Sequence, residues 1–183
     1  MKIIFLDIDG VLNCQVFYDK RGESKTIIEH PDNQICKDRV SWLNELCGDT
    51  GAKVVISSSW RHSGLSYCKE VLQRNGATFD IIDITPDLRS DGCVRGNEIK
   101  AWIDKNIESP YDYREYVIID DDSDMLLWQK DNFFQTDGYA GLTPTTCYKV
   151  LRHFQKLGTV PACHRFTALC LWWNLKNRCS LKY

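Results

Sequence analysis

The sequence predicts an α/β fold, a three-layer sandwich in which helices cover both faces of a mostly parallel sheet. Short apolar runs of strand length alternate along the 183-residue chain with segments whose apolar residues recur at helical spacing. This alternation is typical of parallel strands joined by helical crossovers. Such sheets bind ligands at the carboxyl ends of their strands. Three of the runs end in chemically active side chains at that edge: Asp7 and Asp9, Ser57, and Asp120 and Asp121.

Five runs are expected as strands, and the first lies at residues 2–6. It is apolar throughout after its first residue, which is the pattern of a strand buried on both faces. The runs Lys-Val-Val-Ile-Ser at 53–57 and Tyr-Val-Ile-Ile-Asp at 116–120 have the same character. Runs at residues 79–84 and 132–135 complete the expected sheet.

The segments between the strands carry the helical signals. Asp32 is a suitable N-cap for a first helix, and Gly48 and Gly51 are suitable residues to end it. Ahead of that helix, residues 13–29 contain the turn signal Lys20-Arg-Gly-Glu23, which favours a small hairpin. The later helices are expected at residues 66–74 and 97–106, from about Ser123, and at residues 143–157, where Pro144 suits the first turn.

One domain, residues 1–157, accounts for this alternation, and a C-terminal extension follows at residues 158–183. The extension is aromatic and its charge is basic: no acidic residue follows Asp137, and seven Lys and Arg lie from Lys149 onward. Its apolar stretch at residues 166–175 is far too short to span a bilayer. We expect the stretch to dock on the body of the domain, with a homo-oligomer contact or a membrane-surface contact as alternatives.

The composition is ordinary for a soluble globular protein, with 43% hydrophobic and 26% charged residues. The first apolar run is too short for a signal peptide. Nine cysteines are scattered without a Cys-x-x-Cys pair, which argues against a disulfide framework and a structural zinc site. A cytoplasmic location is therefore expected.

The chemistry of the strand ends favours a divalent cation. At least three carboxylates would meet at one edge, and like charges about 4 Å apart repel by ~1 kcal/mol in water and ~4 kcal/mol near a protein surface. A hard cation removes that penalty, and oxygen-only ligands favour Mg²⁺. A carboxylate can also attack phosphorus to form an aspartyl-phosphate. A hydroxyl and a cationic side chain would then hold the transferring phosphoryl oxygens.

These residues stand in three motifs that together resemble the haloacid dehalogenase (HAD) superfamily of Mg²⁺-dependent phosphatases. The resemblance covers about residues 1–157 and implies a HAD-like, Rossmann-type sheet. The motifs are a strand ending in Asp-x-Asp-Gly, a strand ending in Ser or Thr, and a strand ending in paired acids. They stand here, in the superfamily's order, as Phe5-Leu-Asp7-Ile-Asp9-Gly-Val-Leu12, Val54-Val-Ile-Ser57 and Val117-Ile-Ile-Asp120-Asp121.

The resemblance implies a role for each motif residue. Asp7 would be the nucleophile, and Asp9 the general acid that protonates the leaving oxygen and then activates water. Ser57 would hydrogen-bond the phosphoryl group, with Ser58 as its substitute in a register shifted by one residue. The implied Mg²⁺ ligands are the side chains of Asp7, Asp120 and Asp121 and the backbone carbonyl of Asp9.

The resemblance also implies a cationic residue ahead of the fourth strand. Arg95 stands at the entrance of the helix expected at 97–106, where a helix N-terminus also favours anions. Lys100 lies inside that helix and is the alternative to Arg95. Arg61 follows the second motif and is a further candidate for contacting substrate phosphate, the alternative being an ordinary surface arginine.

No large cap domain is expected, because residues 10–53 and 61–94 have room for only one or two elements each. An open site favours a macromolecular substrate, or a subunit partner that supplies the missing wall. The segments Arg95-Gly-Asn-Glu-Ile and Ile119-Asp-Asp-Asp-Ser-Asp-Met-Leu-Leu-Trp128 resemble the 3′-phosphatase domain of polynucleotide kinase-phosphatases and related RNA-repair proteins. The basic C-terminal end would suit a nucleic-acid backbone.

Two other functions stay open at this point. One is a small-molecule phosphatase, such as a nucleotidase, that oligomerisation closes. The other is a non-catalytic module, either receiver-like or phosphatase-like. Receiver domains usually carry adjacent acids at the first strand, whereas Asp7 and Asp9 are separated by one residue. An inactive binding module would be expected to lack one of these two acids.

Overall fold

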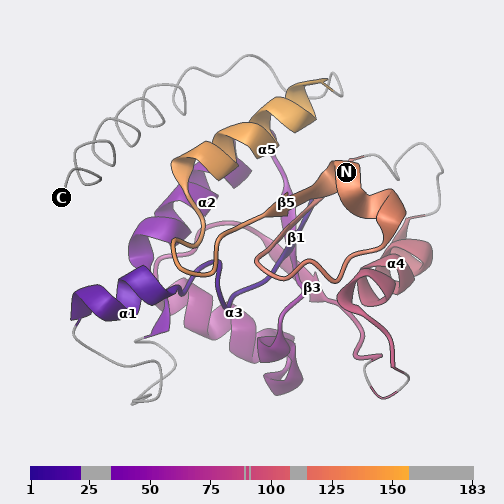
Figure 1. Cartoon of the computed structure of the whole chain (residues 1–183), viewed down its shortest axis with the longest axis horizontal. Coiled ribbons are helices and arrows are strands. Elements are labelled where there is room, and N and C mark those ends of the chain that lie inside the picture. Colours follow the sequence, from indigo (N-terminus) through magenta and orange to yellow (C-terminus); the bar gives the residue numbers. More distant parts are fainter. Residues whose placement is uncertain (22–33, 89, 91, 108–114, 157–183) are drawn as a thin grey trace.

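The computed structural model describes residues 1–21, 34–88, 90, 92–107 and 115–156. Its centre is a five-stranded, all-parallel sheet in the order β3-β2-β1-β4-β5, which confirms the predicted α/β class (Figure 1). The five runs predicted as strands all form strands, with ends that differ by no more than two residues. The strands are β1 (Ile3–Leu6), β2 (Lys53–Ile56), β3 (Ile81–Ile84), β4 (Tyr116–Asp120) and β5 (Phe133–Gln135).

Helices cover both faces of the sheet, as a doubly covered parallel sheet requires. Side chains of β1 alternate between two cores: Ile4 and Leu6 enter the larger one, and Ile3 and Phe5 enter the smaller one. Figure 1 shows α4 on one side of the sheet and α2 with α5 on the other. The larger core is built with α2 (Lys37–Thr50), α3 (Leu65–Arg74) and α5 (Pro144–Lys156), and the smaller core with α4 (Arg95–Asn106).

The register of the three central strands sets the position of the polar residues that follow them. Leu6 pairs with Ile56 on one side and with Ile119 on the other. The next residue on each strand is therefore Asp7, Ser57 or Asp120, and all three lie at the same level at the edge of the sheet. Because side chains alternate along a strand, these three share the face that α4 covers.

The predicted hairpin at residues 13–29 is wrong in the part that the structure describes. Residues Gln15–Arg21 form a helix, α1, while residues 22–33 lie outside the described residues. The predicted N-cap Asp32 lies in that same range. The helix expected after it, α2, begins at Lys37 with Cys36 as its N-cap. Gly51 ends α2 at a φ of 67°, in the left-handed region that favours glycine.

The prediction of a helix from about Ser123 is also wrong, because Asp124 forms hydrogen bonds with the first turn of α4 instead. The carbonyl and carboxylate of Asp124 accept hydrogen bonds from the backbone N–H groups of Gly96 and Arg95, at 3.2 and 3.0 Å. These bonds satisfy free N–H groups in the first turn of α4. The chain then forms only a 3-10 turn, η5 (Leu127–Asn132), before β5.

Within the described residues, no helix is long and apolar enough to cross a membrane. The C-terminal extension at 158–183 lies outside those residues. Its docking on the domain and its homo-oligomer contact therefore stay predictions.

Candidate active site

Three carboxylates meet where β1 and β4 end. Oxygen atoms of Asp7, Asp120 and Asp121 all lie within 4.8 Å of one another. Burial raises the pKa of Asp7 to about 7, although the neighbouring Arg95 charge acts to lower it. Burial raises the pKa of Asp120 to about 8, and the negative charge of Asp7 adds to that rise. The positive charge of Arg95 therefore does not fully offset the cost of burying these carboxylates together.

This arrangement fits a magnesium ion. Oδ1 of Asp120 accepts a hydrogen bond from the backbone N–H of Asp122 at 3.0 Å. Oδ2 of Asp120 is buried and accepts no hydrogen bond from any of the described residues. A hard divalent cation prefers such oxygen ligands and would satisfy this oxygen while offsetting the repulsion among the acids.

The glycine of the first motif holds the acids close together. Gly10 has a φ of 69°, which non-glycine residues rarely adopt. A Cβ atom at Gly10 would overlap the carboxylate of Asp121. Gly138 also approaches this carboxylate closely, because a Cβ there would lie 2.8 Å from Oδ2. Asp121 can therefore lie beside Asp7 only because two backbones without side chains make room for it.

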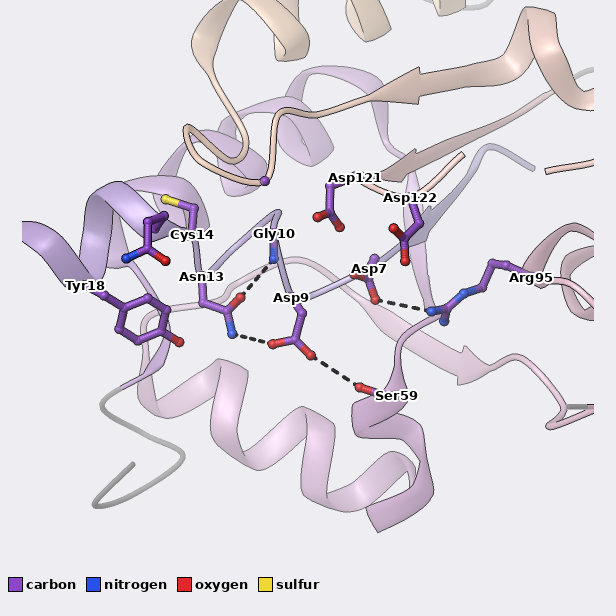
Figure 2. A pocket seen from close by; sticks show the side chains of 12 residues that line it. Asp7, Asp9, Gly10, Asn13, Cys14, Tyr18, Ser59, Arg95, Asp121 and Asp122 are labelled. Atoms are coloured by element: carbon purple, nitrogen blue, oxygen red, sulfur yellow. Dashed lines mark hydrogen bonds and ion pairs between the residues drawn. The ribbon is translucent and has the colours of Figure 1, made fainter. Parts of the chain in front are cut away.

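Arg95 is the cationic side chain that lies beside these acids. As the first residue of α4, it points from the helix N-terminus towards the strand ends (Figure 2). Its Nη2 lies 3.9 Å from Oδ1 of Asp7, and its Nε lies 3.8 Å from Oδ2 of Asp120. It also donates a hydrogen bond to the carbonyl of Ser57. The structure does not bring Lys100 to the site, because that side chain pairs with Asp104 on the exposed surface of α4.

The two serines after β2 have different surroundings, although both are buried. The hydroxyl of Ser57 accepts a hydrogen bond from Thr85 at 3.5 Å. The buried Oγ of Ser58 has no hydrogen-bond partner at ordinary distance among the described residues. The hydroxyl of Ser58 acts to lower the pKa of Asp7, although burial raises that pKa by a larger amount. This influence of Ser58 indicates that its hydroxyl lies beside the Asp7 carboxyl and faces it.

Asp9 lies next to the acid cluster and is held by three donors. Its Oδ1 accepts a hydrogen bond from Nδ2 of Asn13 at 2.8 Å. Its Oδ2 accepts bonds from Nε1 of Trp60 at 3.1 Å and from Oγ of Ser59 at 3.3 Å. None of these three donors is predicted from the sequence. The segment Ser57-Ser-Ser-Trp-Arg61 stands out in the sequence as polar residues at the end of a strand, but its spacing from Asp9 does not indicate a contact.

Arg61 is held in a buried ion pair, and its contact with substrate phosphate stays a prediction. Its guanidinium is buried with the carboxylate of Glu98, at 2.7 Å, and the two side chains are only 3% and 1% exposed. The same guanidinium donates to the carbonyl of Ser58 at 2.9 Å and lies 3.7 Å from Asp87. Arg61 thus connects the turn after β2 to Glu98 of α4.

We expect Arg61→Met to lower the free energy of unfolding by about 3–5 kcal/mol, because it leaves the buried carboxylate of Glu98 without its partner. The measurement is urea unfolding of the purified variant. Arg74→Met is the matched control, since its pair with Glu70 is exposed and worth about 0–1 kcal/mol. A free energy of unfolding equal to that of the wild type, together with a raised KM for phosphate esters, would instead indicate that Arg61 binds substrate.

Asp7, Asp9, Asp121 and Arg95 line one pocket of about 320 Å³. Figure 2 shows Asp7, Asp121, Asp122 and Arg95 on one side of it, with Asn13 and Tyr18 on the other. Tyr18 belongs to α1, so the helix that replaces the expected hairpin forms a wall of the pocket. The pocket therefore extends from the acid cluster to a second side with fewer acidic residues, where the rest of a bound molecule can lie.

A comparison with protein families agrees with this geometry. A family model described as "HAD domain in Swiss Army Knife RNA repair proteins" matches residues 3–147. The match begins at the start of β1 and ends inside α5, so it contains every residue that lines the pocket. No curated protein and no solved structure matches the chain.

Proposed function

The chain belongs to the HAD domains of Swiss Army Knife RNA repair proteins, and from this premise we propose that it is a Mg²⁺-dependent phosphomonoesterase that removes 3′-phosphates from nucleic-acid ends. Membership supports a HAD-type hydrolase, and the metal, the mechanism and the substrate are the proposal. The observation that carries it is the placement of Arg95 3.9 Å from Asp7, within a cluster whose acid oxygens lie within 4.8 Å of one another.

In the proposed reaction, Asp7 attacks the phosphorus atom. Its carboxylate oxygen forms a bond to phosphorus while the ester P–O bond breaks, which gives an aspartyl-phosphate. Arg95 and the hydroxyl of Ser58 hold the equatorial phosphoryl oxygens, where negative charge is concentrated. Mg²⁺, held by Asp7, Asp120 and Asp121 with the backbone carbonyl of Asp9, would neutralise the acids and the phosphate.

Asp9 moves the proton in both half-reactions. As a carboxylic acid it gives its proton to the leaving oxygen when the ester bond breaks. As a carboxylate it then takes a proton from the water that attacks the phosphorus of the aspartyl-phosphate. The bond between Asp7 and phosphorus breaks, inorganic phosphate leaves, and both side chains return to their starting states.

The proposed substrate is a polynucleotide end because the pocket lacks a cover among the described residues. Between Gly10 and Lys53 the described chain forms only α1 and α2, and between Arg61 and Val94 it forms only the end of η2 (Ser59–Ser63), α3 and β3. A small substrate would leave the reacting phosphate open to water. A nucleic-acid strand can cover the opening itself, and the family description points to RNA.

A substrate panel tests the proposal. Phosphate release would be measured from a 3′-phosphorylated oligoribonucleotide, the same strand with a 5′-phosphate, a nucleoside 3′-monophosphate and an aryl phosphate, each with Mg²⁺ and with EDTA. We expect the highest kcat/KM for the 3′-phosphorylated strand and no turnover in EDTA. Cleavage of small nucleotides alone would contradict the polynucleotide substrate but would still agree with a phosphatase. No phosphate release from any of the four would contradict the phosphatase as well.

A further inference from the structure

We propose that Asn13 and Trp60 are positioning residues of Asp9, and that they adapt the site to phosphate esters of aliphatic alcohols. Such alcohols, which include the hydroxyls of sugars, leave only when their oxygen receives a proton. This inference rests on the proposed function and adds to it the residues that hold the acid and the class of leaving group.

The donors to Asp9 come from two separate parts of the chain. Asn13 follows β1 closely, whereas Ser59 and Trp60 form the start of η2 after β2. They occupy both oxygens of the carboxylate, with Asn13 at Oδ1 and the other two at Oδ2. Figure 2 shows Asp9 between Asn13 and Ser59 at the side of the pocket. The plane of the carboxylate is therefore fixed from two directions.

Asn13 is itself held in one orientation. Its side chain is buried, and its Oδ1 accepts a hydrogen bond from the backbone N–H of Gly10 at 3.1 Å. The carbonyl end of the amide is thereby committed to the motif turn. The amide NH₂ group must then face Asp9, which settles the orientation that an asparagine side chain otherwise leaves open.

Trp60 is held by its ring. The indole packs against the larger core and lies 6.3 Å from the ring of Tyr67, centroid to centroid. Its carbonyl accepts a hydrogen bond from the thiol of Cys68 at 3.5 Å. An indole N–H that is half-buried in this way needs an acceptor, and Asp9 provides it.

The donors determine where a proton on Asp9 can point. Indole Nε1 can only donate, and so can the amide NH₂ of Asn13. Neither group can accept a hydrogen bond from a protonated Asp9. The acid O–H is therefore directed away from both of them, towards Ser59 or the pocket, where the leaving oxygen of a substrate can accept it. Ser59 can rotate its hydroxyl, so it adapts to either protonation state of Asp9.

The test compares two leaving groups in the Mg²⁺-loaded protein. The substrates are 4-nitrophenyl phosphate, whose leaving group departs without a proton, and a nucleoside 3′-monophosphate, whose leaving group needs one. The quantity is kcat/KM, which reports the step in which the leaving group departs. Trp60→Phe removes the N–H and keeps an aromatic ring in the core.

We expect Trp60→Phe to lower kcat/KM for the nucleotide by roughly 10–100-fold, part of the range that general acid–base catalysis supplies. The loss for the aryl phosphate should be several times smaller. Asn13→Ala should show the same selectivity, and it serves as the second variant if Trp60→Phe fails to fold. Trp42→Phe is the matched control, because Trp42 packs on the same core from α2 and should leave the ratio of the two substrates unchanged.

Equal losses on both substrates in Trp60→Phe and Asn13→Ala would overturn the inference and leave only a structural role for these residues. Because the wild-type protein would still be active, that result would not touch the proposed function. A wild-type protein that releases phosphate from neither of these substrates nor from the 3′-phosphorylated strand would overturn both.

Discussion

Asp7→Asn is expected to lower kcat for phosphate release by roughly 10⁴-fold or more, within the range seen when a catalytic nucleophile is removed. The amide has nearly the shape of the carboxylate but cannot form the bond to phosphorus. It also removes one of the charges that crowd the site, since the oxygens of Asp7 lie within 4.8 Å of those of Asp120 and Asp121. The variant should therefore keep its fold while it loses its activity.

The measurement is single-turnover phosphate release with the 3′-phosphorylated strand, together with urea unfolding of the same preparation. Asp104→Asn is the matched control, because Asp104 is an exposed acid on α4 that pairs with Lys100 at the surface. It should retain full activity. Undiminished turnover in Asp7→Asn would contradict the assignment of the nucleophile.

Arg95→Ala is expected to lower kcat by roughly 10²–10³-fold, the cost of removing one group that stabilises charge in a transition state. Arg95 is the cation that lies beside Asp7 and Asp120. Arg95→Lys should restore only part of the loss, because an ammonium cannot reproduce the planar set of guanidinium donors. The measurement is the pair of kcat and KM values for each variant.

Lys100→Ala is the control on the same helix, since that side chain pairs with Asp104 at the surface. Its kcat should stay within about twofold of wild type, as for an exposed residue outside the site. If Lys100→Ala were impaired and Arg95→Ala were not, the choice between the two candidate cations would be reversed.

The sheet and the acid cluster could be predicted because both follow from local patterns. Apolar runs of four or five residues give the strands, and parallel strands bring their carboxyl ends to one edge. The positions of Asp7 and Asp120 in adjacent strands then follow from the register that pairs Leu6 with Ile119. The preference for Arg95 over Lys100 follows from its expected place at a helix entrance, and Arg95 is the first residue of α4.

The rest depends on contacts between distant residues that no local pattern reveals. The sequence leaves Arg61 as a surface or substrate-binding residue, because its buried partner Glu98 lies 37 positions further along the chain. Ser59 and Trp60 were missed as donors to Asp9 for the same reason, since they lie 50 and 51 positions away from it. The acids after β4 looked like the start of a helix, but Asp124 instead accepts hydrogen bonds from the first turn of α4.

The covalent intermediate on Asp7 tests the central claim most directly. Asp9→Asn protein would be mixed with 4-nitrophenyl phosphate and Mg²⁺, quenched in acid and digested for mass spectrometry. The leaving group needs no proton from Asp9, whereas hydrolysis of the intermediate does need Asp9 as a base, so the intermediate should accumulate. We predict a burst of nitrophenol and one phosphoryl group on Asp7. A burst with the phosphoryl group on Asp120 or another residue, or with Asp7 unmodified, would contradict the account.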